Sequence, residues 1–269
     1  MKIETVEITP EFAKTLLNQN ENNRKLSRVR VEAITRDILD GNWVFDGSPI
    51  RVSSDGELLD GQHRLAAVCR AGVPVVSLLI IGLERDSSIT MDSGKSRTLA
   101  DQLKMQGEKS STNLSSVIKA CYSAEKDGFI SDRLRTISNQ EALQFLEDNP
   151  EVREALLIGR RTSSVFPAMP TSVAGGLYFI FSKIDEVDAK FFFEKLPQAA
   201  HEEGSPILAL REALISKKVS TKNARGGVSR LWYSGITIKA WNAFREGREI
   251  KSLRFSPGGA VREKVPVAM

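Results

Sequence analysis

Hydrophobic and polar positions alternate at the start of the chain and then recur at helical spacing. Residues 2–8 alternate charged and apolar side chains, which predicts a half-buried strand. Thr9 followed by Pro10 predicts an N-cap and a first helical residue, opening a short helix that ends near Asn18. A longer helix is predicted over 27–41, because its apolar residues share one face and a glycine closes it.

A strand–turn–helix–strand pattern follows. Residues 49–53 and 57–59 predict two short strands, and the Asp-Gly pair between them favours a hairpin. An apolar helix is predicted directly after residues 60–64, with its end at Gly72. Residues 73–82 predict a buried strand by their length and branched side chains. This part of the chain is therefore expected to form a compact α/β unit.

The rest of the chain has a helical pattern. A helix is predicted over 99–106, and a capping box, Ser138 with Glu141, predicts the start of another. Further helices are predicted at roughly 113–127, 139–148, 151–160, 171–183, 185–196, 206–216 and 228–246. We therefore expect an α/β domain over 1–107, followed by a mostly α-helical domain over 113–269.

Composition narrows the class of protein. With 269 residues, 41% hydrophobic and 27% charged, the chain fits neither collagen, nor a coiled coil, nor a disordered protein. No stretch approaches the roughly 18 consecutive apolar residues of a membrane helix, and the first residues lack a secretory pattern. Two cysteines are too few for a disulfide framework, and the spacing supports no zinc site. We expect a cytoplasmic protein with no membrane partner.

Charge is spread unevenly along the chain. Residues 211–269 carry 13 Lys and Arg against 4 Asp and Glu, which favours a nucleic acid or another polyanion as partner. Four basic residues are the candidate DNA contacts: Lys217, Lys218, Lys222 and Arg225. Aromatic residues recur at helical spacing beyond them, at Trp232, Tyr233, Trp241 and Phe244. These aromatic residues either stack on nucleic-acid bases or pack in a hydrophobic core, with the basic residues on the solvent-exposed face of the helix.

The segment most suggestive of chemistry is 58–67, where a strand enters a glycine turn and a helix starts at once. The free N–H groups and the positive dipole end of such a helix form an anion site. Arg64 adds a planar phosphate donor, and His63 can donate to a phosphate oxygen. Asp60 could act as a base or hold a metal ion. Alternatively, Asp60 is only an N-cap and Arg64 a solvated helix residue.

The residues Gly61-Gln62-His63-Arg64 resemble the phosphate motif of the ParB/sulfiredoxin superfamily. Sulfiredoxins carry Gly-Cys-His-Arg between the same strand and helix, and ParB proteins carry Gly-Glu-Arg-Arg. The helix–strand pattern that follows and the Asn-Arg-Lys segment upstream are also similar, so the resemblance covers about 20–82. It implies a ParB/sulfiredoxin-like nucleotide-binding domain in a phage or plasmid-like context.

The resemblance assigns roles to single residues. Gly61, Gln62, His63 and Arg64 would hold nucleotide phosphates, and Arg24 is either an exposed turn residue or part of a lid over them. Sulfiredoxin's catalytic cysteine is replaced by Gln62 here, so thiol repair is not expected. The altered ParB motif leaves the nucleotide base open, with ATP and CTP both possible.

A second constellation lies in the loop before residue 99. Asp92 could bind Mg²⁺ or accept a proton, while Lys95 and Arg97 could reach phosphates. The letters Gly-Lys-Ser suggest a P-loop, but Ile89 stands five residues before Gly94 where that motif requires glycine, so the P-loop is excluded. The alternative is a helix-entry turn with a hydroxyl cap.

Three functions remain open at this point. The leading hypothesis is NTP hydrolysis or phosphoryl transfer, with Asp60 and Asp92 as catalytic residues and Mg²⁺ bound with ATP or CTP. The second is a non-catalytic DNA-binding partition or regulatory protein that nucleotide gates. The third is a ParB-like nuclease, which the lack of clustered carboxylates disfavours. A homodimer is possible under each hypothesis. Trp43 is predicted to be a core anchor rather than a base-stacking platform.

Overall fold

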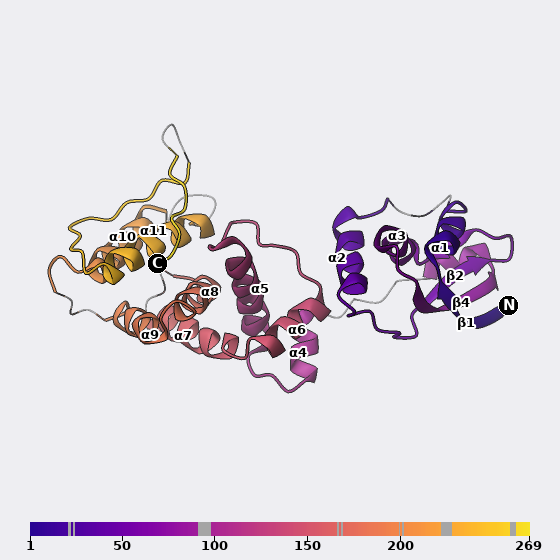
Figure 1. Ribbon diagram of the computed structural model, residues 1–269, viewed down its shortest axis with the longest axis horizontal. Helices are drawn as coiled ribbons and strands as arrows, with labels where there is room; N and C mark the ends of the chain where they lie inside the picture. Colours follow the sequence, from indigo (N-terminus) through magenta and orange to yellow (C-terminus); the bar gives the residue numbers. More distant parts are fainter. Residues whose placement is uncertain are drawn as a thin grey trace. The chain divides into compact units, whose positions relative to one another are not determined.

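The computed structural model describes the chain apart from residues 21, 22, 24, 91–97, 166, 168, 199, 201, 222–227 and 259–261; it describes only the backbone of 88–90 and 218–221. The chain forms two compact units (Figure 1). The first comprises Met1–Arg97 with Thr136–Glu141, and the second comprises Thr98–Arg135 with Ala142–Met269. The division falls ten residues before the boundary expected at 107.

The first unit is built on a four-stranded sheet with the order β1-β4-β2-β3. Its strands are β1 Lys2–Ile8, β2 Pro49–Ser53, β3 Leu58–Asp60 and β4 Val75–Leu83. β4 pairs antiparallel with β1 and parallel with β2, while β2 and β3 form the predicted antiparallel hairpin. The parallel pair requires a crossover, which the helix after β3 provides.

The first unit's helices are α1 Pro10–Leu17, α2 Arg28–Leu39, α3 Gln62–Ala71 and the short 3₁₀ helix η1 Arg85–Thr90. The predicted caps are confirmed: the Thr9 hydroxyl accepts from Phe12 N at 3.2 Å, and Gly72 ends α3 in the left-handed region. α3 packs against α1 and α2. The buried centre is aliphatic, with Ile8, Ile50, Leu58, Leu65, Val68 and Leu79.

The second unit is helical among its described residues. Its helices are α4 Leu99–Met105, α5 Ser111–Asp127, α6 Asn139–Asp148 (whose first turn belongs to the first unit), α7 Val152–Val165, α8 Thr171–Ser182, α9 Glu186–Lys195, α10 Pro206–Thr221 and α11 Arg230–Arg245. α8 packs against α5 and α7, and its Phe181 ring stacks on Trp241 of α11 at 4.5 Å. The predicted capping box of α6 is confirmed, since Ser138 N donates to Glu141 Oε2 at 2.7 Å and Glu141 N donates to Ser138 Oγ at 3.1 Å.

The mixed α/β character expected from the sequence is confirmed at this coarse level. Two helix ends differ from expectation: α7 continues to Val165 instead of 160, and α10 to Thr221 instead of 216. Both cysteines are free; Cys121 is buried, and burial raises the pKa of its thiol. In the part of the chain that the structure describes, no helix has the length and apolar character needed to cross a membrane.

Candidate functional site

The predicted site begins at the turn between β3 and α3. Gly61 lies there with φ 105°, in the left-handed region that favours glycine. A Cβ at this position would also lie 3.0 Å from Ile50 Cγ1, so the turn needs glycine for conformation and for space. Because glycine has no side chain, it gives the N-terminus of α3 no side-chain cap. The first N–H groups of α3 are therefore left without a side-chain cap and can donate to a bound acceptor.

A cavity of about 370 Å³ lies at this helix end. α2, β2, α3 and the segment before β2 all contribute to its wall. Three arginines line it, Arg30, Arg51 and Arg64, against two aspartates, Asp46 and Asp60, which leaves one net positive charge. Apolar side chains form the remaining wall: Ile34, Trp43 and Val44. The cavity thus combines a basic side and an apolar side.

Arg64 is held by backbone carbonyls at the edge of this cavity. Its Nη1 donates to Ser48 O at 2.5 Å and its Nη2 to Pro49 O at 2.7 Å. Burial lowers the pKa of Arg64, although a guanidinium in a protein stays protonated. The interpretation as a solvated helix residue is therefore wrong: Arg64 fixes the segment before β2 against α3 and brings a positive charge to the cavity.

Asp60 is surrounded by donors. Its Oδ2 accepts from Arg51 Nη1 at 2.8 Å and lies 3.6 Å from Arg64 Nη2, while its Oδ1 accepts from Gly61 N at 2.7 Å. Both oxygens therefore accept hydrogen bonds from the fold, and the roles of Asp60 as a general base or a Mg²⁺ ligand stay predictions. This geometry favours a positioning role, in which Asp60 holds two arginines beside the helix end.

His63 and Gln62 are buried and engaged in the fold. His63 Nε2 accepts from Ser27 N at 3.0 Å, so this nitrogen carries no proton, and the predicted donation to a phosphate oxygen would fall to Nδ1. Gln62 Oε1 accepts from Asn20 Nδ2 at 3.1 Å. These bonds tie α2 and the segment after α1 to the α3 N-terminus. The two side chains thereby hold the neighbouring segments in place around the start of α3.

Sequence reasoning missed Arg30 and Arg51. Arg51 lies on β2 and Arg30 on α2, and only the tertiary fold brings them to α3. Arg30 is exposed, and within the described residues its guanidinium makes no hydrogen bond or ion pair. Arg30 lies three residues after Ser27, the N-cap of α2. In the sequence this spacing indicates the start of a helix and gives no sign of a binding site. Arg30 is thus the arginine most available to a ligand.

Several predicted residues cannot be placed. Arg24, Asp92, Lys95, Arg97, Lys222 and Arg225 lie outside the described residues, as does the side chain of Lys218. Lys217 is described, and its Nζ lies 5.5 Å from the centroid of the Trp232 ring. Across the described part of the chain, no group of three His, Cys, Asp or Glu side chains is arranged to hold a metal ion. The predicted Mg²⁺ and DNA contacts therefore stay predictions.

The aromatic residues are placed clearly. Trp232, Tyr233 and Trp241 are buried, which favours the core interpretation of the aromatic stripe over nucleic-acid stacking. Trp43 packs against the core of the first unit, as expected, and its Nε1 donates to Val76 O at 3.1 Å. Its ring nevertheless also borders the cavity, so the two roles considered for Trp43 are compatible.

Comparison of the chain with protein-family models, with curated proteins and with solved structures finds no match.

Proposed function

We propose that the first unit binds a nucleoside triphosphate, with its phosphates at the N-terminus of α3. The observation that carries this proposal is the convergence of Arg30, Arg51 and Arg64 on one cavity at an uncapped helix N-terminus. Helix N-termini favour anions through their N–H groups and dipole, and arginine matches the geometry of phosphate oxygens. The resemblance of residues 61–64 to the ParB/sulfiredoxin motif supports the same ligand.

The shape and polarity of the cavity agree with a nucleotide. Its volume of about 370 Å³ lies within the range of small-molecule pockets, roughly 300–1,000 Å³. Arg51 and Arg64 share Asp60, whereas Arg30 has no such partner among the described residues. We therefore assign Arg30 to direct phosphate contact. Ile34, Trp43 and Val44 offer an apolar wall to a nucleobase.

The geometry supports binding more strongly than chemistry. Asp60 is engaged at both oxygens and His63 at Nε2, so neither described side chain is poised to move a proton. A non-catalytic protein gated by nucleotide is therefore favoured over an NTPase. Phosphate release from ATP or CTP with Mg²⁺ tests this choice: measurable turnover that Asp60→Asn abolishes without unfolding would restore hydrolysis as the function.

The binding experiment uses two neighbouring arginines of α2. Calorimetric titration with ATP, CTP, GTP and UTP, with and without Mg²⁺, should give binding by at least one of them. Arg30→Ala should weaken it about tenfold, the loss of one charge-assisted contact, with an unchanged melting temperature. Arg28→Ala is the matched control, since Arg28 is 85% exposed and, among the residues that the structure describes, pairs with Glu32 alone. Equal affinities for the two variants, or no binding by the intact chain, would contradict the proposal.

A further inference from the structure

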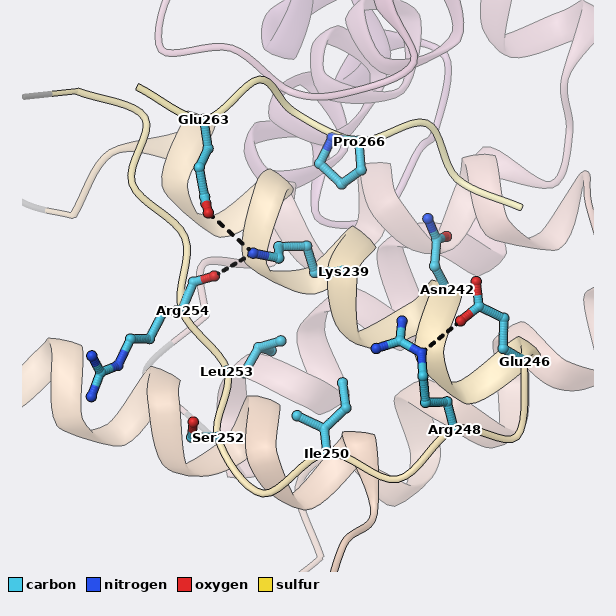
Figure 2. A pocket seen from close by; sticks show the side chains of 10 residues that line it. All are labelled: Lys239, Asn242, Glu246, Arg248, Ile250, Ser252, Leu253, Arg254, Glu263 and Pro266. Atoms are coloured by element: carbon cyan, nitrogen blue, oxygen red, sulfur yellow. Dashed lines mark hydrogen bonds and ion pairs between the residues drawn. The ribbon is translucent and has the colours of Figure 1, made fainter. Parts of the chain in front are cut away.

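The chain after α11 returns along that helix as an extended strap, residues 263–269. Figure 2 shows its beginning, where the Lys239 amine lies between Glu263 and the carbonyl of Arg254. Lys239 Nζ donates to Arg254 O at 2.7 Å and lies 3.4 Å from Glu263 Oε1. Glu263 Oε2 in turn accepts from Ser256 N at 3.0 Å. One lysine of α11 therefore holds both the backbone at Arg254 and the start of the strap at Glu263.

The rest of the strap is held through its main chain. Asn242 Nδ2 donates to Val267 O at 2.8 Å, and Asn242 Oδ1 accepts from Met269 N at 3.1 Å. Trp241 Nε1 donates to Met269 O at 2.7 Å. The side chains of Val267 and Met269 remain 82% and 50% exposed. α11 thus holds this segment by its backbone and leaves side chains on its outer face unburied.

The strap forms one wall of a second cavity, of about 370 Å³, whose other walls are the end of α5 and the end of α8. Its lining is mostly apolar: Ala124, Phe129, Ile180 and Ile184 face Val265, Pro266 and Ala268 of the strap. Pro266 borders this cavity and also the polar one drawn in Figure 2. The strap therefore separates an apolar space from a polar one.

The charged residues around the apolar cavity are neutralised in pairs. Lys183 Nζ lies 2.5 Å from Glu125 Oε1 and donates to Asn149 Oδ1 at 2.9 Å. Asp127 Oδ1 accepts from Arg135 Nε at 2.8 Å. These pairs leave no net charge to attract an ion. The site is therefore suited to an uncharged occupant.

We propose that this cavity binds a compact, uncharged apolar molecule, and that the strap is the wall that closes it. Enclosed apolar cavities of about 150 Å³ already accept benzene, so the volume here admits a ligand of that size or larger. Ala268 and its neighbour Val267 both border the cavity, whereas Met269 lies outside its lining. Asn242 bonds to the backbone of Val267 and of Met269, on both sides of Ala268. These two hydrogen bonds therefore determine how readily the strap moves away from the cavity.

The test uses fluorobenzene as the probe, observed by ¹⁹F NMR in the presence of the intact chain. Ala268→Phe places a ring in the cavity and should weaken probe binding at least tenfold. Met269→Phe adds the same ring at a half-exposed position outside the lining and should leave binding unchanged. Circular dichroism confirms that both variants are folded. No binding by the intact chain, or equal binding by the two variants, would overturn the ligand site.

A second variant tests the strap. Asn242→Ala removes both main-chain bonds and should shorten the lifetime of bound fluorobenzene several-fold, read from the ¹⁹F exchange broadening. Arg248→Ala is the control, since Arg248 lies just beyond α11 and pairs with the exposed Glu246. An Asn242→Ala lifetime equal to that of the control would show that the strap does not close the cavity.

Discussion

The two units of the chain each contain a cavity of about 370 Å³, and the two cavities differ in how charge is arranged. In the first unit, three arginines face two aspartates, Asp46 and Asp60, so one net positive charge faces the space. Asp60 pairs with Arg51 and Arg64, and Arg30 has no such partner among the described residues. In the second unit, each charged group of the lining has an opposite partner. The first cavity is therefore built for an anion and the second for a neutral ligand.

The difference comes from the elements that form each wall. A strand end, a glycine turn and a helix N-terminus present polar backbone groups in the first unit. In the second unit the C-terminal ends of α5 and α8 meet an extended strap, and mostly apolar side chains line the space between them. Gly61 in the first unit and Gly235 in the second are both required, for different physical reasons. Substitution of Gly61 tests mainly the need for a left-handed backbone conformation, and substitution of Gly235 tests the need for space.

The largest effect is expected from Gly235→Ala in α11. A Cβ there would lie 2.2 Å from Phe255 Cε1, and Phe255 is only 4% exposed, so the ring has no free space to enter. Overpacking of this kind should lower the free energy of unfolding of the second unit by about 3 kcal/mol. Urea unfolding followed by circular dichroism measures it.

Two controls sharpen this prediction. Gly235→Ala combined with Phe255→Leu should recover part of the loss, because the smaller side chain relieves the clash. Nucleotide affinity of the first unit should not change in either variant. If the Gly235→Ala chain is as stable as the parent, the segment after α11 that carries Phe255 can move away from the helix without cost, which contradicts the prediction.

A smaller effect is expected from Gly61→Ala. The φ of 105° is strained for a residue with a Cβ, which should cost about 2 kcal/mol of stability and weaken nucleotide binding. Gly61→Asn should cost less, since asparagine enters the left-handed region more readily than alanine. Equal losses for the two variants would mean that contact with Ile50, and not backbone conformation, sets the requirement. Urea unfolding with nucleotide titration distinguishes these outcomes.

Local signals in the sequence predicted most of the secondary structure. Thr9 with Pro10, Gly72, and Ser138 with Glu141 mark helix ends through bonds made within a few residues, and all are observed. The ends of α7 and α10 lie five residues beyond the predicted ones, and α7 continues through Gly159 instead of ending there. In α7, close packing of Gly159 against Gly175 of α8 and burial of Thr162 favour continuation of the helix over an end at the glycine.

The candidate site was only partly predictable. The glycine turn and Arg64 follow from a motif of adjacent residues, so the sequence indicates them directly. Arg30 and Arg51 come from other elements and reach the cavity through packing of α2 and pairing of β2. The strap after α11 has neither helical nor strand periodicity, and its main-chain bonds to Asn242 carry no sequence signature.

The most direct test of the nucleotide site is a two-dimensional amide NMR titration of the intact chain with the nucleotide that calorimetry selects. Phosphates at the N-terminus of α3 should shift the amide signals of Gln62, His63 and Arg64 most strongly, together with the Arg30 side-chain Nε–H. The Arg30→Ala variant should show the same shifts of the Gln62, His63 and Arg64 amide signals at about tenfold higher nucleotide concentration. Shifts confined to residues 211–269, with the α3 signals unmoved, would contradict the account and assign the polyanion to the basic part of the chain.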